Sequence, residues 1–124
     1  MGAYEFMGCQ AVPSIEITAF GPTYIWPPNK KTVDITVLGR IILPENCTLL
    51  SSSFSLVDEY GVYSTADVLS VDANGDFSLV TTVEASRNGS DMDGRVYTLT
   101  LLAEDEAGTA QSAPLASLVP HDQR

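Results

Sequence analysis

The side chains that could carry out chemistry in this sequence are few. There is one histidine, His121, and there are two cysteines, Cys9 and Cys47, whereas the motifs of a nucleophilic serine, a phosphate-binding loop and a zinc-binding histidine pair are absent. His121 stands close to the C-terminal end of the sequence, where a positioned general base is unexpected. We therefore expect that this chain is not an enzyme.

Carboxylates can also act in pairs, as they do in glycoside hydrolysis. The order of the acidic residues here does not single out such a pair, because they stand among residues that favour turns. This holds for Asp58, Glu59, Asp91 and Asp93. We interpret these four as turn residues.

One short segment has the opening spacing of a calcium loop. Asp72, Asn74 and Asp76 offer oxygen side chains at its first, third and fifth positions. However, Phe77 replaces the usual glycine, and Val83 stands where the twelfth residue would be a bidentate glutamate. Two interpretations follow: a hairpin turn without an ion, favoured by the Asn-Gly dipeptide, or a calcium site completed by a carboxylate from another loop. No cofactor is required.

The charge of the chain limits its partners. Sixteen acidic and six basic residues give a formal net charge of −10, which repels nucleic-acid phosphates and anionic lipid surfaces. No apolar run is long enough for a membrane helix. We therefore expect neither a nucleic-acid partner nor membrane insertion.

The elements that must position these residues are β-strands. Apolar and polar residues alternate with period two, and turn signals recur about every ten to fifteen residues. The predicted strands are 14–20, 31–42, 49–57, 62–71, 77–85, 95–104 and 109–119, the last interrupted or confined to a sheet edge by Pro114. With 124 residues, 44% apolar and 18% charged, the chain has enough apolar surface for one folded domain.

Seven short antiparallel strands indicate an all-β fold, an immunoglobulin-like sandwich over residues 13–124. Its expected buried residues are Val33, Ile35, Val37, Tyr97, Leu99 and Leu101. The hydroxyl of Tyr97 is expected to bond to a nearby loop backbone, as in a tyrosine corner. Thr98 and Thr100 would then face outward, and Leu102 breaks the alternation.

Trp26 precedes two prolines that hold an extended segment. Its expected role is core packing, where it covers one open end of the sandwich. The alternative is an exposed aromatic platform that stacks on a sugar ring. Exposure of Trp26 distinguishes the two.

Cys9 and Cys47 are predicted to form a disulfide. Cys9 lies just before the first strand and Cys47 just after the second, so antiparallel pairing of these strands brings them together. The alternative is that Cys9 belongs to a linker and Cys47 is a small buried apolar residue. Because disulfides persist in oxidising compartments, the pairing favours a secreted or cell-surface protein.

Several segments resemble a family of bacterial immunoglobulin-like modules found at the C-termini of large secreted proteins. They are YIWPPNKK at 24–31, GRVYTLT at 94–100, AEDEAG at 103–108 and VPHDQ at 119–123. The resemblance spans residues 22–123, with Lys30 replacing a histidine of the family and Thr109 an asparagine. In addition, residues 1–6 resemble the end of a parallel β-helix repeat domain.

The resemblance implies that residues 1–12 are a tail or linker from an upstream domain, with an export signal further upstream of Met1. We accordingly expect a non-catalytic structural or adhesive module that spaces or docks a larger exported protein. Its expected partners are that upstream domain and, beyond it, cell-envelope components, a glycan or other copies of itself. The alternative function is a carbohydrate-binding module.

Overall fold

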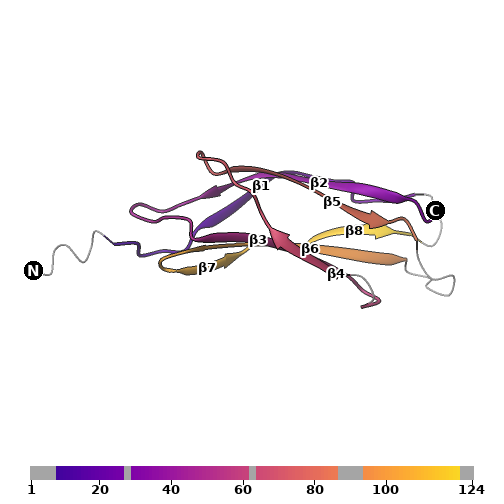
Figure 1. Ribbon diagram of the computed structural model, residues 1–124. Helices are drawn as coiled ribbons and strands as arrows, with labels where there is room; N and C mark the ends of the chain where they lie inside the picture. Colours follow the sequence, from indigo (N-terminus) through magenta and orange to yellow (C-terminus); the bar gives the residue numbers. More distant parts are fainter. Residues whose placement is uncertain (1–7, 27–28, 62–63, 87–93, 121–124) are drawn as a thin grey trace, which may run out of the picture.

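The computed structural model describes residues 8–26, 29–61, 64–86 and 94–120, which form two antiparallel sheets that face each other (Figure 1). The smaller sheet has the order β1 (Ser14–Gly21), β2 (Thr32–Ile42) and β5 (Asp76–Glu84). The larger sheet has the order β4 (Ser64–Val68), β3 (Ser51–Asp58) and β6 (Arg95–Asp105), and β6 also pairs with β7 (Gly108–Gln111) and β8 (Leu115–Val119). The predicted all-β, immunoglobulin-like sandwich is confirmed.

The core lies between the sheets and follows the alternation seen in the sequence. Along β6, the side chains of Tyr97, Leu99, Leu101 and Ala103 are at most 1% exposed. The residues between them face outward and are half-buried, Leu102 included. Ile35 and Val37 of β2 are buried as predicted. Val33 is only half-buried, because it is the second residue of β2 and lies where the strand begins.

The predicted last strand is divided in two. Pro114 lies between β7 and β8, where its missing N–H cannot contribute to a ladder. A buried serine compensates for the interruption. The backbone N–H of Ser112 donates to the carbonyl of Leu101 (2.9 Å), and the Ser112 hydroxyl accepts from the N–H of Leu101 (2.9 Å). Both halves therefore remain attached to β6.

The first strand leads into a segment that crosses to the other sheet. The peptide bond between Gly21 and Pro22 is cis, and after it the chain runs parallel to β8. There the N–H of Leu118 donates to the carbonyl of Thr23 (2.9 Å), and the N–H of Ile25 donates to the carbonyl of Leu118 (2.8 Å). One continuous segment thus touches both sheets and places Ile25 in the core.

The two ends of the sandwich are built from different segments. At one end lie the approach to β1 and the last residue of β6, Asp105. At the other end lie the first residue of β6, Arg95, and its ladder partner Val119, the last residue of β8. Figure 1 shows the start of β1 and the end of β8 at opposite sides of the molecule.

Candidate functional sites

Cys9 and Cys47 form a disulfide at the end of the sandwich where β1 begins. Their sulfur atoms are 1.99 Å apart and their Cα atoms 4.6 Å apart, within the range that a disulfide bridges. The antiparallel pairing of β1 and β2 brings the two cysteines together, because Ser14 at the start of β1 pairs with Ile42 at the end of β2. The predicted pairing is therefore present, for the predicted reason.

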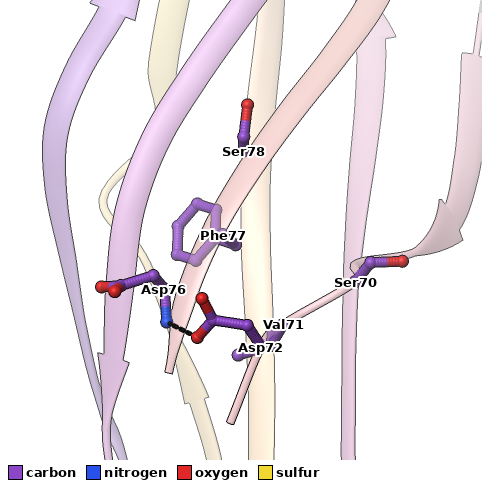
Figure 2. A pocket seen from close by; sticks show the side chains of 6 residues that line it. All are labelled: Ser70, Val71, Asp72, Asp76, Phe77 and Ser78. Atoms are coloured by element: carbon purple, nitrogen blue, oxygen red, sulfur yellow. Dashed lines mark hydrogen bonds between the residues drawn. The ribbon is translucent and has the colours of Figure 1, made fainter. Parts of the chain in front are cut away.

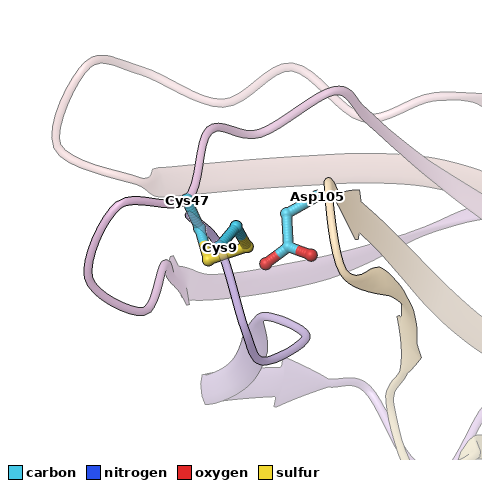
Figure 3. A group of neighbouring side chains, drawn as sticks. All are labelled: Cys9, Cys47 and Asp105. Atoms are coloured by element: carbon cyan, nitrogen blue, oxygen red, sulfur yellow. A yellow bond between two sulfur atoms is a disulfide. The ribbon is translucent and has the colours of Figure 1, made fainter. Parts of the chain in front are cut away.

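A buried carboxylate lies against this disulfide. Asp105 is 2% exposed, and one of its oxygens lies within 4.8 Å of both sulfur atoms. Figure 3 shows the carboxylate facing the bridge. Its Oδ1 accepts from the N–H groups of Ala107 (2.8 Å) and Gly108 (3.2 Å), which shapes the turn between β6 and β7. Its Oδ2 is buried without a hydrogen-bond partner in the described part of the chain.

The calcium candidates Asp72, Asn74 and Asp76 belong to the hairpin turn that leads into β5, whose first residue is Asp76. Figure 2 shows the side chains of Asp72 and Asp76 close together. Asp72 Oδ1 accepts from the backbone N–H of Asn74 and from that of Asp76, both at 2.9 Å. Gly75 has a φ of +88°, and a Cβ there would lie 2.3 Å from the carbonyl oxygen of Ile41. The turn therefore needs glycine, and it uses the Asp72 carboxylate as an internal acceptor.

The second carboxylate of this segment is also engaged. Asp76 Oδ1 accepts from Arg40 Nε of β2 at 2.9 Å, and this hydrogen bond together with the charge of Asp76 raises the pKa of the guanidinium. A shallow hollow of about 440 Å³ lies beside the turn, between the segment 70–72 and the start of β5. This geometry favours the hairpin-turn interpretation, and calcium binding stays a prediction.

Trp26 lies on the surface, so the expectation that it packs in the core is wrong. Its exposed fraction is 36% and that of Tyr24 is 48%, whereas Ile25 between them is 3% exposed. The reason is the extended conformation beside β8, in which successive side chains alternate between faces. Ile25 takes the inward position, and the two aromatic residues face out.

The aromatic pair joins a sheet face that carries little charge. Tyr24 is the bridge partner of Leu118, which pairs with Val96 on the outer face of the larger sheet. Hydroxyl and aliphatic side chains occupy the central outward positions of this face: Ser53, Ser55, Val57, Ala66, Thr98, Thr100 and Ala116. We call these residues, with Tyr24, Trp26, Val96 and Leu118, the neutral face. By contrast, the outer face of the smaller sheet carries Glu16, Asp34, Arg40, Asp76 and Glu84.

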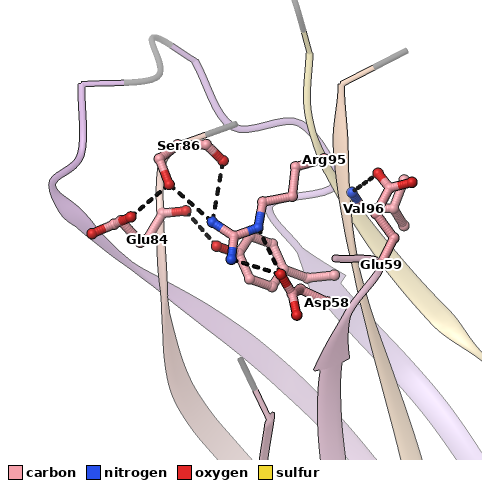
Figure 4. A network of polar contacts seen from close by, with 7 residues as sticks. Asp58, Glu59, Glu84, Ser86, Arg95 and Val96 are labelled. Atoms are coloured by element: carbon pink, nitrogen blue, oxygen red, sulfur yellow. Dashed lines mark hydrogen bonds and ion pairs between the residues drawn. The ribbon is translucent and has the colours of Figure 1, made fainter. Parts of the chain in front are cut away.

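A buried ionic network lies at the opposite end from the disulfide (Figure 4). Arg95 Nε and Nη2 donate to Asp58 Oδ2 at 3.0 and 2.6 Å, and Nη1 donates to the hydroxyl of Ser86 at 2.9 Å. The guanidinium also lies 4.8 Å from the ring centres of Tyr60 and Tyr97. Both members of the salt bridge are buried, with side chains 8% and 0% exposed.

Sequence reasoning missed this network, because Asp58 was interpreted as a turn residue. Asp58 does open a turn, since its carbonyl accepts from the N–H of Gly61 at 3.2 Å. It is also the last residue of β3, and its buried side chain continues the inward alternation of Phe54 and Leu56. That alternation was the available signal. Glu59 does lie just beyond the strand, where it accepts from the N–H of Val96 at 2.8 Å. Asp91, Asp93 and His121 lie outside the described residues.

The hydroxyl of Tyr97 makes the bond expected from the sequence, though its acceptor belongs to a strand. It donates to the carbonyl of Glu84, the last residue of β5, at 2.7 Å. Since β5 belongs to the smaller sheet and Tyr97 to the larger one, this bond ties the two sheets together. Burial raises the pKa of the hydroxyl, and the charge of Arg95 opposes that shift.

No protein-family model matches the chain, and no curated protein is significantly similar to it. The described residues include no helix that could cross a membrane. The resemblance to bacterial immunoglobulin-like modules stays a prediction, and residues 1–6 and 121–123, which contribute to it, lie outside the described part. The function is therefore inferred from the fold and from the geometry of these sites.

Proposed function

We propose that this chain is a non-catalytic structural module that spaces or docks a larger exported protein. The observation that carries the proposal is that the described chain approaches β1 at one end of the sandwich and leaves β8 at the other (Figure 1). The central strand β6 has eleven residues, so these ends are about 35 Å apart. A module with this path adds length between whatever precedes and follows it.

The disulfide supports this role. It holds the segment before β1 against the end of β2, which fixes the direction from which the chain approaches the sandwich. Such bonds are retained in oxidising compartments and are rare in reducing ones. The pair is therefore consistent with a secreted or cell-surface protein, in which an upstream domain is the first partner to consider.

The spacing role can be tested by placing the whole chain between two folded fluorescent domains and measuring energy transfer between them. A spacer predicts a narrow distance distribution with a mean no shorter than the sandwich. The Cys9→Ala/Cys47→Ala variant should broaden the distribution, because the leading segment is released. A mean distance shorter than the sandwich would refute the role, and so would a distribution that the double variant leaves unchanged.

A second candidate function is the binding of a neutral glycan, and the exposure of Tyr24 and Trp26 favours it. Two residues apart in an extended segment, their side chains are spaced by about 7 Å. Aromatic faces offer apolar surface on which sugar rings stack. The hydroxyls of Thr98 and Thr100 lie on the same neutral face. The scarcity of charge there favours a neutral sugar over a charged one.

Affinity electrophoresis in gels that contain soluble neutral polysaccharides tests this second candidate. Retardation that Tyr24→Ala and Trp26→Ala abolish would support it. Leu38→Ala is the matched control, since Leu38 is 40% exposed on the other sheet. Equal mobility of all variants with every polysaccharide would remove the candidate and leave the spacing role standing.

A further inference from the structure

The end of β6 places a buried carboxylate beside the disulfide, and the structural role does not require that carboxylate. The sulfur atoms of Cys9 and Cys47 and a carboxylate oxygen of Asp105 all lie within 4.8 Å of one another (Figure 3). The two cysteines are half-buried and Asp105 is buried. Three segments far apart in the sequence therefore meet at one point.

The carboxylate is incompletely satisfied while the disulfide is closed. Oδ1 accepts two backbone N–H groups, but Oδ2 has no partner among the described residues. A disulfide has no proton to donate, so it cannot serve as a hydrogen-bond donor to Oδ2. A buried polar atom without a partner is costly, and a cation or a thiol proton beside it would remove that cost.

We propose that Cys9, Cys47 and Asp105 form a binding site for a thiophilic divalent cation such as Zn²⁺ once the disulfide is reduced. Bond and ion are alternative ways to hold the segment before β1 against the sandwich. This inference does not depend on the spacing role, since it concerns only the local chemistry of this cluster.

The ligand set suits such an ion. Zinc binds cysteine sulfur at about 2.3 Å and carboxylate oxygen at about 2.0–2.2 Å, usually with four ligands. Atoms already within 4.8 Å of one another need only small movements to surround it. Because both cysteines are partly exposed, a water molecule can complete the coordination.

The reaction balances in two steps. First, an external dithiol transfers two electrons and two protons to the bridge: the Cys9–Cys47 bond breaks, two thiols form, and the dithiol becomes a disulfide. Second, the cation binds both sulfurs, and the two thiol protons pass to solvent. Asp105 contributes its carboxylate as the third ligand. Since the two thiolates already neutralise the dication, the carboxylate leaves the loaded cluster with one net negative charge.

The test uses the whole chain in oxidised and reduced form. Reduction is carried out with a phosphine, which becomes a phosphine oxide by taking oxygen from water and does not compete as a thiol for the metal. Zn²⁺ is then titrated, and binding is followed by calorimetry and by the melting temperature. We expect the reduced chain to bind one ion and to melt at a higher temperature with it, and the oxidised chain to do neither.

Two variants assign the ligands. Asp105→Asn keeps one oxygen to accept from the N–H groups of the turn, but an NH2 group replaces the unpartnered oxygen. Because an NH2 group of an amide is not a ligand for zinc, the variant should weaken Zn²⁺ binding at least tenfold. Glu104→Gln is the matched control, since Glu104 lies next in sequence but is exposed and bonds to Ser51. It should bind as the unchanged chain does. If the reduced chain unfolds, Zn²⁺ should refold it, and Asp105→Asn should require more of the ion.

Three results would overturn the proposal. The reduced chain could show no stoichiometric binding, or Zn²⁺ could fail to raise its melting temperature or to restore its fold. The oxidised chain could bind Zn²⁺ with the same affinity, which would place the site elsewhere. Finally, Asp105→Asn could bind as tightly as Glu104→Gln, which would show that the two thiols act without the carboxylate.

Discussion

The central strand β6 has a buried charged residue at each of its ends, and the two residues differ in how completely their side chains are paired. Its first residue, Arg95, has two hydrogen bonds to Asp58, two to Ser86 and two aromatic rings beside it. Its last residue, Asp105, has two backbone donors on one oxygen and none on the other. A covalent bond, between Cys9 and Cys47, closes that second end instead.

The difference lies in how each end is stabilised. The ionic end depends on complete pairing, because a buried charge that loses its partner costs more than the pair contributes. The disulfide stabilises the other end mainly through its effect on the unfolded chain, because it restricts the conformational freedom of that chain. The first end should therefore be indifferent to reductant, whereas the second should lose its stabilising bond when a reductant is added.

The largest effect is expected when Asp58 is changed to Ala. The guanidinium of Arg95 is then buried without a counter-ion, and the free energy of unfolding should fall by about 3–5 kcal/mol. Urea denaturation measures the change. Arg40→Gln is the control, since it breaks the salt bridge to Asp76, whose side chains are 52% and 46% exposed. That exposed bridge should contribute far less to stability than the buried one, because solvent screens it, and equal losses in both variants would contradict the comparison.

Removing the disulfide should have a similar or slightly smaller effect. The cysteines are 38 residues apart, and in the chain-entropy model a loop of this length stabilises the fold by about 4 kcal/mol. We expect Cys9→Ala/Cys47→Ala to lose up to this amount in urea denaturation. Reductant should destabilise the unchanged chain similarly and leave the double variant unaffected. A double variant that reductant still destabilises would show that another process is involved.

Tyr97→Phe tests the bond between the sheets beside the ionic end. Loss of the hydrogen bond to Glu84 should cost about 1 kcal/mol near neutral pH. Because the pKa of Tyr97 is raised on folding, its contribution is present below the unfolded pKa of about 10 and is lost as pH rises through the folded value. The stability of the unchanged chain should thus fall more steeply above pH 10 than that of the variant. Parallel curves would contradict this assignment.

The smallest effect is expected at Glu106, near the disulfide. Its carboxylate accepts from the backbone N–H of Thr48 at 2.8 Å, and this hydrogen bond lowers its pKa. The sign is opposite to that of Tyr97: the contribution is present above the unfolded pKa of about 4.3 and is lost as pH falls through the folded value. Glu106→Gln should therefore show a weaker loss of stability on acidification below about pH 5. Identical acid profiles of variant and unchanged chain would refute it.

Much of the fold could be predicted because period-two alternation is a local property of the chain. The alternation predicts the inward positions of β6 from Tyr97 to Ala103, and Pro114 predicts the interruption of the last strand. The cysteine pairing was also accessible, because it needs only antiparallel pairing of two neighbouring strands. Each of these inferences uses residues close in sequence or elements adjacent in it.

What the sequence could not decide depended on contacts between distant segments. Whether Ile25 or its aromatic neighbours would be buried was settled by pairing with β8, which lies almost a hundred residues further along the chain. Asp58 and Asp105 have the same side chain and both end a strand. One meets Arg95 across the ladder between β3 and β6, and the other meets a disulfide. A carboxylate has no preference of its own between these roles, so only the tertiary structure could assign them.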